Sequence, residues 1–485
     1  MLDLSVIHQL EQMFGKENVL SSREDRIAYS YDGTPVINSF PGAAMFANDV
    51  EQISQLLKLA NEERFTIIPR GSGTGLSGGT IPDENSVVLL MNRWKNIIEI
   101  DKDNLTAWVE PGVITANLHR EVEKRGLFYP PDPASMNICT IGGNVAENSG
   151  GLRGLKYGVT KNYVMGMEAV LATGEIAGLG GKNVKDVAGY NLTDFLIGSE
   201  GTLAIFTKIL LKLIPLPKTS KTMLAYFPGM EHAAQTVSGI ITAHIIPTTL
   251  EFLDRTTIQC VEDFAKIGLP REVGALLLIE VDGHPEQVEE EAEQITRICQ
   301  NNGAAEVHVA RNRQEADKLK TARRSAFAAL ARVQPTTILE DVTVPRSKIA
   351  PMVAKIQTIA QKYNLTIGIF GHAGDGNLHP TALTDERDKD EIERVEKAFE
   401  EIFTAAIQLG GTITGEHGIG LSKKKFFEKW VSHGEKELMQ RLKSALDPNN
   451  ILNPGKIFNL SPKCEGHLPS SRAEADRLHF RTAKR

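Results

Sequence analysis

Apolar residues recur at two spacings along the chain, and each spacing predicts a different kind of element. Met1–Phe14 has apolar residues at helical spacing among acids and amides, so we expect an amphipathic helix there. A second helix is expected over Val50–Asn61. Short apolar runs bounded by turn residues predict strands over Arg64–Pro69, Ser86–Met91 and Ile205–Leu213. The proline-containing segment Ile214–Pro217 follows, and we interpret it as a domain edge.

A β-hairpin is predicted over Ile367–His379, because Asp375-Gly376 between two apolar runs is a strong signal for a tight turn. In this register His372 and His379 lie directly opposite each other and share one face of the hairpin. Their Cβ atoms would then be about 4.5–5.5 Å apart. Two imidazoles at that separation can hold one divalent ion.

A third metal ligand is available in Gly415–Gly418, where two glycines flank Glu416 and His417. Two histidines and one carboxylate form an open site that suits zinc, iron or manganese, and zinc is our first choice. One alternative is that His372 and His379 only pack or hydrogen-bond across the hairpin. Another is that His417 serves only as a hydrogen-bonding partner of Glu416.

The run Arg70–Gly79 contains five glycines and three hydroxyl residues, so its backbone amides can converge on phosphate oxygens. Part of the run matches the dinucleotide pattern G-x-G-x-x-G, but that pattern must open a helix. Here Pro82 and the apolar run Ser86–Met91 follow instead. The sequence therefore predicts a strand–loop–strand cradle for a diphosphate.

Further glycine clusters occur at Thr140–Gly151, Val187–Leu192 and Gly198–Leu203. A single cluster of this kind would be explained well enough by glycine turns between strands. Their repetition favours a flat, phosphate-bearing cofactor that lies against the backbone, with Asn and Ser side chains supplying hydrogen bonds.

The composition is that of an ordinary soluble protein, with 41% hydrophobic residues, 24% charged residues and a net charge of −7. A chain of 485 residues is longer than one hydrophobic core normally supports, so two or three domains are expected. There is no basic excess that would indicate nucleic-acid binding. Without a signal-peptide pattern or an apolar run of about 18 residues, we expect a cytoplasmic protein with no membrane span. The four cysteines are scattered and match no iron–sulfur or disulfide framework: Cys139, Cys260, Cys299 and Cys464.

From about residue 15 to Phe458 the chain resembles the flavin subunit of glycolate oxidase and its relatives, D-lactate and D-2-hydroxyglutarate dehydrogenases, within the vanillyl-alcohol oxidase superfamily of flavoproteins. The motifs that carry this resemblance are Pro69–Gly78, Val187–Tyr190, Gly198–Leu203, Gly371–His379, Gly415–Gly418 and Leu452–Lys456. Each motif is weak alone, and together they are specific.

The resemblance implies an α+β fold, with a two-subdomain FAD-binding domain of the vanillyl-alcohol oxidase type and an antiparallel-sheet cap domain. The FAD-binding domain is expected at residues 1–217, with its core at about 38–217, and the cap with the substrate and metal sites at 218–430. A C-terminal segment at 431–460 would return to the first domain. Residues 461–485 are expected to form a tail.

Bound FAD is also implied by the resemblance. The residues expected around the diphosphate are Arg70, Gly71, Ser72, Gly73, Thr74, Gly75, Leu76 and Ser77. Those expected along the rest of the cofactor are Pro131, Asp132, Thr140, Gly143, Asn144, Gly150, Ile205 and Asn453. Relatives with covalent flavin use a histidine in the first loop, and Arg70–Gly79 contains none, so non-covalent FAD is expected. Ala204 stands where the family usually has glycine.

The metal site and the resemblance lead to one hypothesis, the oxidation of a small D-2-hydroxy acid such as D-lactate or glycolate. The acid would bind the metal through its carboxylate and hydroxyl groups, and the metal would lower the hydroxyl pKa. His417 would remove the hydroxyl proton while the Cα hydride passes to flavin N5. Arg323 matches the family arginine that binds the substrate carboxylate, and Asn377 matches a substrate-contacting asparagine or is structural.

The reduced flavin must pass its electrons on, and the sequence has neither a haem motif nor an iron–sulfur motif. An electron-accepting protein is therefore expected, either an iron–sulfur subunit or an electron-transfer flavoprotein, and any membrane association would come through such a partner. Three alternatives stay open. They are a D-2-hydroxyglutarate dehydrogenase, a non-redox transferase on the same FAD fold, and a flavin-loaded relay subunit with a vestigial metal site. The lysine typical of hydroxyglutarate-specific enzymes is absent near Leu339, which favours the smaller acids.

Overall fold

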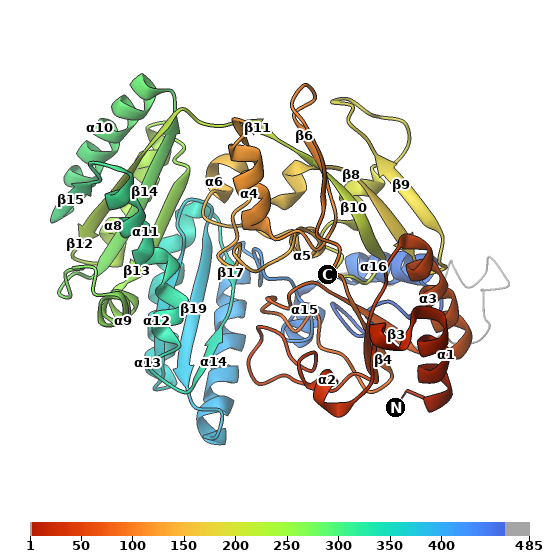
Figure 1. The fold of residues 1–485 in the computed structure, drawn as a ribbon. Coiled ribbons are helices and arrows are strands. Elements are labelled where there is room, and N and C mark those ends of the chain that lie inside the picture. Colours follow the sequence, from red (N-terminus) through yellow and green to blue (C-terminus); the bar gives the residue numbers. More distant parts are fainter. Residues whose placement is uncertain (1, 461–485) are drawn as a thin grey trace, which may run out of the picture.

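The N-terminal part of the computed structural model, which describes residues 2–460, is built on a four-stranded sheet (Figure 1). Its strands are β1 (Val19–Leu20), β2 (Ala43–Phe46), β3 (Thr66–Arg70) and β4 (Ser86–Leu90), in the spatial order β1-β2-β4-β3. Helices α1 (Leu4–Phe14) and α3 (Val50–Glu63) pack their apolar stripes against this sheet, with Leu10 and Leu56 fully buried. The helices and strands predicted for this region are confirmed, with ends shifted by a few residues.

The glycine-rich run lies between β3 and β4, which are parallel neighbours. Residues 71–85 contain no helix, so the predicted strand–loop–strand arrangement is confirmed. The loop begins where Arg70 ends β3, and it therefore emerges at the carboxyl edge of the parallel strands, where ligands bind in open sheets of this kind.

A five-stranded antiparallel sheet follows, in the order β5-β6-β10-β8-β9. Its strands are β5 (Ile97–Asp101), β6 (Thr106–Val109), β8 (Val164–Leu171), β9 (Ile176–Gly180) and β10 (Ala204–Lys212). The strand predicted at Ile205–Leu213 is thus confirmed as β10. Helices α4 (Thr115–Glu123) and α5 (Ile141–Glu147) pack into the core of this sheet through Leu118, Ile141 and Val145. A two-stranded ribbon joins β7 (Leu127–Phe128) to β11 (Ile214–Pro215).

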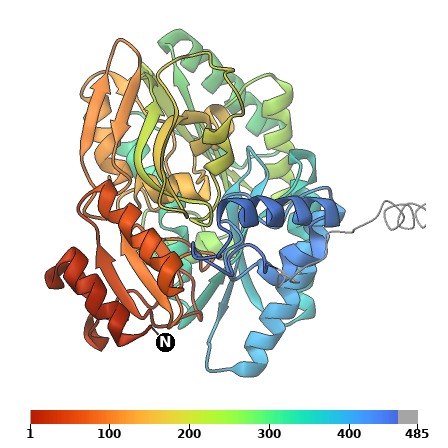
Figure 2. The ribbon, with the colours of Figure 1, turned by 90° about the vertical axis from the view of Figure 1, so that its right-hand side faces the viewer.

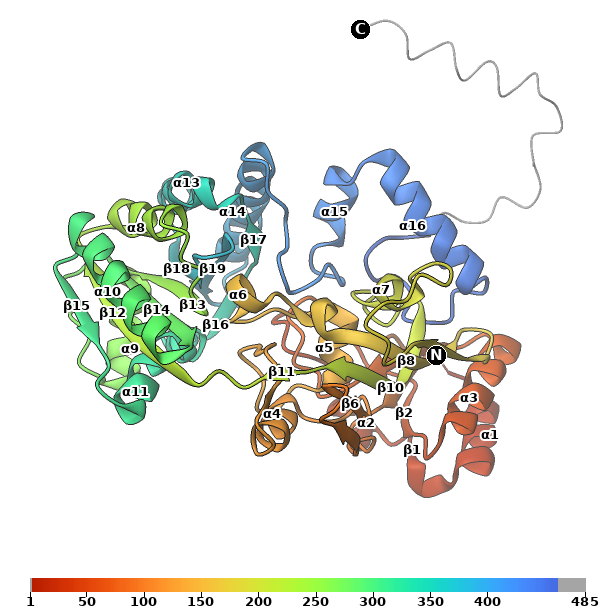
Figure 3. The ribbon, with the colours of Figure 1, turned by 90° about the horizontal axis from the view of Figure 1, so that it is seen from above.

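The chain then enters an eight-stranded antiparallel sheet, which forms the other half of the molecule (Figures 1 and 3). Its strands are β12 (Thr219–Phe227), β13 (Thr249–Asp254), β14 (Ala275–Gly283), β15 (Glu306–Val309), β16 (Thr336–Leu339), β17 (Val342–Thr343), β18 (Thr366–His372) and β19 (Asn377–Thr384). The order is β15-β12-β14-β13-β18-β19-β16, and β17 also pairs with β19.

Helices cover both faces of this large sheet, which explains why every residue of β13 is buried and why β14 is apolar along most of its length. One layer consists of α8 (Met230–Thr242), α10 (Pro285–Asn301), α13 (Ile349–Lys362) and α14 (Lys389–Gln408). The opposite layer consists of α9 (Arg255–Ala265), α11 (Arg313–Arg324) and α12 (Ala326–Leu330). The short helices of the structure are α2 (Arg23–Ile27), α6 (Gly154–Tyr157), α7 (Leu192–Leu196), and 3-10 turns at Lys16–Asn18, Thr160–Tyr163 and Arg346–Lys348.

The last described segment returns to the N-terminal half, as Figures 2 and 3 show for α15 (Lys424–Trp430) and α16 (His433–Leu446). Leu452 forms an isolated bridge with Ile67 of β3, and the Asn453 amide donates to the Ile67 carbonyl at 2.9 Å. The buried Lys443 ammonium donates to the carbonyls of Thr202 and Leu452, at 2.7 and 2.8 Å. The predicted tail and Cys464 lie outside the described residues.

The predicted register of the β18–β19 hairpin is wrong. His372 pairs with Asn377, and His379 pairs with Phe370. The reason is the turn, which takes up the four residues 373–376 rather than the two residues Asp375 and Gly376. His379 nevertheless shares a face with His372, because it lies two residues beyond the partner of His372. The two rings are therefore diagonal neighbours, with centroids 5.2 Å apart.

The described residues include no helix that is both long and apolar enough to cross a membrane.

Candidate functional site

Three sequence-predicted metal ligands meet at the end of the β18–β19 hairpin. His372 ends β18, His379 lies in β19, and Glu416 comes from the loop that follows α14. The Glu416 Oε1 atom lies 3.1 Å from His372 Nε2 and 3.4 Å from His379 Nε2. One ligand atom of each residue falls within 4.8 Å of the others. This set of two imidazoles and one carboxylate fits a divalent cation with open coordination positions.

A further carboxylate, Glu251 of β13, fixes the orientation of His372. Glu251 Oε1 accepts a hydrogen bond from His372 Nδ1 at 2.6 Å, which leaves Nε2 of the same ring facing Glu416. Carboxylates commonly orient metal-binding histidines in this way. Glu251 Oε2 also accepts from Arg323 Nε at 2.6 Å. Glu251 and Arg323 are both buried, so the pair is shielded from water.

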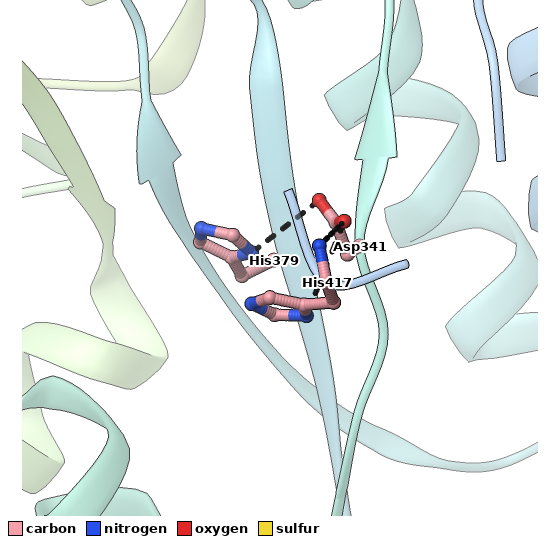
Figure 4. A group of neighbouring side chains, drawn as sticks. All are labelled: Asp341, His379 and His417. Carbon is pink, nitrogen blue, oxygen red and sulfur yellow. Dashed lines mark hydrogen bonds and ion pairs between the residues drawn. The ribbon is translucent and has the colours of Figure 1, made fainter. Parts of the chain in front are cut away.

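A second group of potential ligands overlaps the first and consists of Asp341, His379 and His417 (Figure 4). The rings of His379 and His417 are stacked, with centroids 5.2 Å apart and planes 13° from parallel. Asp341 Oδ1 lies 3.9 Å from His379 Nδ1, and Asp341 Oδ2 lies 4.0 Å from His417 Nδ1. His379 therefore faces Glu416 with one ring nitrogen and Asp341 with the other.

Asp341 holds the loop that carries Glu416 and His417. Its Oδ2 accepts from the Thr414 hydroxyl at 2.7 Å and from the backbone amides of residues 415, 416 and 417 at 2.9–3.0 Å. Asp341 therefore positions the loop through Oδ2. Its other oxygen, Oδ1, has no hydrogen-bond partner among the described residues and is left facing His379 Nδ1.

The charges of the site follow from burial and from these contacts. Burial lowers the pKa of His417 to about 4, although the Asp341 carboxylate acts in the opposite direction. Burial also lowers the pKa of His379. At His372 burial is outweighed by the carboxylates of Glu251 and Glu416, which hold the pKa well above its ordinary value. His417 is thus a neutral base near pH 7, and the same carboxylates that favour a proton on His372 would favour a metal cation.

The two predicted substrate-binding residues lie close to this group. Arg323 packs its guanidinium over the Phe370 ring, 4.7 Å from the centroid. Asn377 is the first residue of β19 and is buried, and its side-chain amide packs closely against Gly415. Among the described residues, Asn377 Oδ1 has no hydrogen-bond partner.

A cavity opens between the glycine loop, α5 and β10. Five of the predicted FAD contacts line it, namely Arg70, Gly71, Thr140, Gly143 and Ile205. Ala204, at the start of β10, lines it too. The lining also includes Pro69, Gly79, Thr80, Met91, Pro111, Gly142, Ala146, Glu147, Glu200, Gly201 and Phe206.

The remaining predicted FAD contacts do not line this cavity. Ser72, Gly73, Thr74, Gly75, Leu76 and Ser77 complete the glycine loop, and the buried Ser77 hydroxyl has no hydrogen-bond partner among the described residues. Asn144 donates to the Thr115 hydroxyl, and Asn453 donates to the carbonyls of Gly79 and Glu200. Pro131 and Asp132 are buried next to His119 and Arg153. Gly150 lies against Glu416, where an added Cβ would be 2.6 Å from Oε2.

The loop that carries Glu416 and His417 is attached to the glycine loop. The Ser77 carbonyl accepts hydrogen bonds from the amides of Leu421 and Ser422, at 2.8 and 3.0 Å. Gly420, at φ +49°, has no room for a Cβ beside the same carbonyl. The candidate metal site of the large sheet and the candidate cofactor site of the N-terminal half are therefore neighbours.

Sequence reasoning missed four acidic residues of the site. Glu147 and Glu200 lie inside glycine motifs that indicated a cofactor site, so the sequence did contain a signal for these two residues. Glu251 also had one, because an acid between two apolar residues of a buried strand must find a buried partner. Asp341 had none that we can identify.

Comparisons with known proteins agree with this arrangement. Residues 41–180 match the FAD binding domain family, and residues 216–457 match the C-terminal domain of the FAD linked oxidases. The glycolate oxidase subunit GlcD of Bacillus subtilis is 56% identical over 94% of this chain and 97% of its own length. The glycolate oxidase subunit GlcD of Escherichia coli K12 is 35% identical over 96% of this chain and 95% of its own length.

A D-lactate dehydrogenase of Anaerostipes hadrus is 36% identical over 86% of this chain and 89% of its own length. Among solved structures, p-cresol methylhydroxylase matches with a TM-score of 0.78 at 19% identity, over 94% of this chain and 97% of its own. An alkyldihydroxyacetonephosphate synthase matches with a TM-score of 0.74 at 19% identity, over 94% of this chain and 86% of its own. At that identity these structures establish the vanillyl-alcohol oxidase type of fold alone. The chain belongs to the FAD-linked oxidase family and is an FAD-dependent oxidoreductase that acts on hydroxy acids.

Proposed function

We propose that this enzyme oxidises a small D-2-hydroxy acid, glycolate or D-lactate, to the 2-oxo acid, with a divalent metal bound by His372, His379 and Glu416. The observation that carries the proposal is the convergence of His372 Nε2 and His379 Nε2 on one oxygen of Glu416, beside the neutral His417. Zinc is our first choice of metal, with iron and manganese as alternatives. The names of the Bacillus and Anaerostipes relatives support both substrates.

Each residue has a distinct task in this proposal. Arg323 binds Glu251 through its Nε atom. Its two terminal nitrogens have no hydrogen-bond partner among the described residues, so they can bind a substrate carboxylate. Asn377 offers its side-chain amide to the substrate. His417 takes the proton of the substrate hydroxyl. Its ring stacks on His379, and its backbone amide donates to Asp341, so these contacts hold His417 in place.

The bound groups would supply the remaining chemistry. A metal at His372, His379 and Glu416 would act as a Lewis acid toward the substrate oxygens. FAD, held non-covalently in the cavity of Arg70, Gly71, Thr140 and Ile205, would accept the hydride from the substrate Cα. The 2-oxo acid would then leave with two electrons and two protons fewer than the hydroxy acid.

Electrons must leave the reduced flavin, and we propose a separate electron-accepting protein, either an iron–sulfur subunit or an electron-transfer flavoprotein. Two relatives are named as subunits of glycolate oxidase, which supports a partner subunit for this chain.

The test is anaerobic flavin absorbance of the metal-loaded enzyme with D-lactate, L-lactate, glycolate and D-2-hydroxyglutarate in turn. We expect rapid bleaching by D-lactate or glycolate, which is lost in His417→Ala and after chelation. Bleaching by D-2-hydroxyglutarate alone would assign the other substrate class. Bleaching that survives chelation would remove the metal from the proposal, and no bleaching by any acid would overturn the oxidation itself.

A further inference from the structure

Two glutamates lie side by side on the wall of the FAD cavity. Glu147 is the last residue of α5, and Glu200 lies in the loop before β10. Both carboxyl groups approach Gly418, where φ is +82°. An added Cβ there would clash with Glu147 Oε2 and lie 3.0 Å from Glu200 Oε1. Two carboxyl groups so close together in a buried place do not both ionise at neutral pH.

Glu200 is the member of the pair whose surroundings favour the ionised form. Its Oε1 accepts a hydrogen bond from the Ile419 amide at 2.8 Å, and its Oε2 accepts from the Gly420 amide at 2.7 Å. Burial raises the pKa of Glu200, and these two hydrogen bonds together with Lys456 and Lys423 oppose that rise. Both oxygens of Glu200 therefore serve as acceptors that hold the loop after His417.

Glu147 has the opposite surroundings. Its Oε2 is buried and has no hydrogen-bond partner among the described residues. Its nearby charges are the carboxylates of Glu200 and Asp32, opposed only by Lys423. Burial, together with these carboxylates, raises the pKa of Glu147 well above its usual range. These surroundings favour the protonated form of Glu147, and a carboxylic acid donates one hydrogen bond.

The position of α5 indicates which part of FAD this donor meets. At the start of α5, the Thr140 hydroxyl packs closely against Gly71 of the glycine loop. Just beyond its end, Gly150 packs against the metal-site residue Glu416. Glu147 lies between these two points along the chain, and its Oε1 would be 3.0 Å from a Cβ on Gly79.

We propose that Glu147 binds FAD as an uncharged acid that donates a hydrogen bond to the flavin portion of the cofactor. Glu147 then differs from the glycine-loop amides, which are expected to contact the diphosphate, and its donor would also affect the redox behaviour of the flavin. Reduction adds electron density to the ring, so a donor there stabilises the reduced form.

Three variants test this proposal: Glu147→Gln, which keeps a donor of the same shape, Glu147→Leu, which removes it, and the control Glu280→Gln. Glu280 lies on β14, where it pairs with Lys320 and with the Thr222 hydroxyl, and it does not line the cavity. The apoproteins are titrated with FAD and with ADP, and the midpoint potential of each holoprotein is measured. Thermal unfolding of the apoproteins checks folding, and Glu147→Asp replaces the Leu variant if that variant does not fold.

We expect Glu147→Gln and Glu280→Gln to bind FAD within about threefold of the parent. Glu147→Leu or Glu147→Asp should bind FAD about tenfold or more weakly, with a more negative midpoint potential and unchanged ADP affinity, because one hydrogen bond to the flavin is lost. Parental FAD affinity and potential in the Leu or Asp variant would overturn the proposal. If Glu147→Gln loses as much FAD affinity as Glu147→Leu, the charge of Glu147 matters, and the proposal is overturned. If ADP affinity falls as much as FAD affinity, the contact is at the diphosphate, and the proposal is also overturned.

Discussion

Glu251 connects two groups that the proposed chemistry uses, because its two oxygens contact His372 Nδ1 and Arg323 Nε at 2.6 Å each. Glu251→Gln keeps the shape but removes the charge and one acceptor. We expect metal affinity to fall about 10- to 100-fold, the usual effect of losing a carboxylate behind a metal-binding histidine. Competition with a chelator of known affinity measures this. Glu280→Gln on the neighbouring strand is the matched control, and equal affinities in both variants would contradict the role of Glu251.

His119 gives the enzyme a defined response to acid. It is buried with Nε2 2.9 Å from the Pro131 carbonyl, and burial together with Arg153 lowers its pKa from 6.5 to about 4. Between these values the unfolded state binds a proton that the folded state does not, so stability falls as the pH drops from 6.5 to 4. The full loss is about 3 kcal/mol. Above pH 6.5 this contribution is complete.

Denaturant unfolding of the parent and of His119→Gln at several pH values tests this. Glutamine can still donate to Pro131 but cannot take up a proton. The variant should therefore lose less stability between pH 6.5 and pH 4 than the parent does. Parallel stability curves for the two proteins would show that His119 does not titrate as described.

At the scale of residues, the sequence was informative where chemistry and backbone requirements coincide. His372, His379 and Glu416 were identifiable because polar, reactive side chains stand among glycines. Their supports were harder to find, since Glu251 lies 121 residues before His372, and Asp341, between β16 and β17, lies 75 residues before Glu416. Such contacts depend on sheet order, which local patterns do not determine.

At the scale of elements, the β18–β19 turn is packed so closely that it tolerates only glycine at one position. Gly376 has φ +89°, and an added Cβ would clash with the Val344 carbonyl. Gly268 has nearly the same φ of +88° but no atom within 4 Å of the Cβ position. Comparing the two glycines therefore separates backbone strain from the clash.

We expect Gly268→Ala to lower the free energy of unfolding by about 1 kcal/mol, from strain alone. Gly376→Ala should lower it by about 3 kcal/mol or more, because backbone must move as well. Denaturant unfolding of both variants measures the difference. If Gly268→Ala and Gly376→Ala are equally stable, the turn adjusts its backbone to make room for the Cβ at residue 376, and the prediction is wrong.

The elements also show why a correct strand assignment does not ensure a correct register. The apolar runs of β18 and β19 were recognisable, but the Asp-Gly signal suggested a two-residue turn. The structure instead closes a four-residue turn through hydrogen bonds from the Asp375 and Gly376 amides to the His372 carbonyl, at 3.2 and 3.0 Å. The loop before β4 was predicted correctly, because the absence of a following helix can be seen directly in the sequence.

At the scale of the whole molecule, the two halves must be held in a fixed relation for cofactor and substrate sites to stay adjacent. One contact that does this joins α6 to the end of β14. Lys156 Nζ donates to Asp282 Oδ1 at 2.6 Å, and the Tyr157 hydroxyl donates to Asp282 Oδ2 at 2.9 Å. Asp282 is buried, and α6 also packs close to the metal-site turn, since a Cβ on Gly154 would lie 3.1 Å from Asp375 Oδ2.

Asp282→Asn removes the charge that Lys156 faces, and we expect the free energy of unfolding to fall by about 2–3 kcal/mol. The loss should be concentrated at the junction between the halves, so amide hydrogen exchange should increase in residues 154–158 and at the start of β12, which pairs with Asp282. The first sheet should be unaffected. Lys208→Met is the control, because the Lys208–Glu168 pair is more exposed and such pairs contribute about 0–1 kcal/mol. The prediction is contradicted if Asp282→Asn raises amide exchange no more than Lys208→Met does. Apolar packing would then hold the junction. The Lys156 and Tyr157 contacts would not be needed to place the metal site beside the flavin.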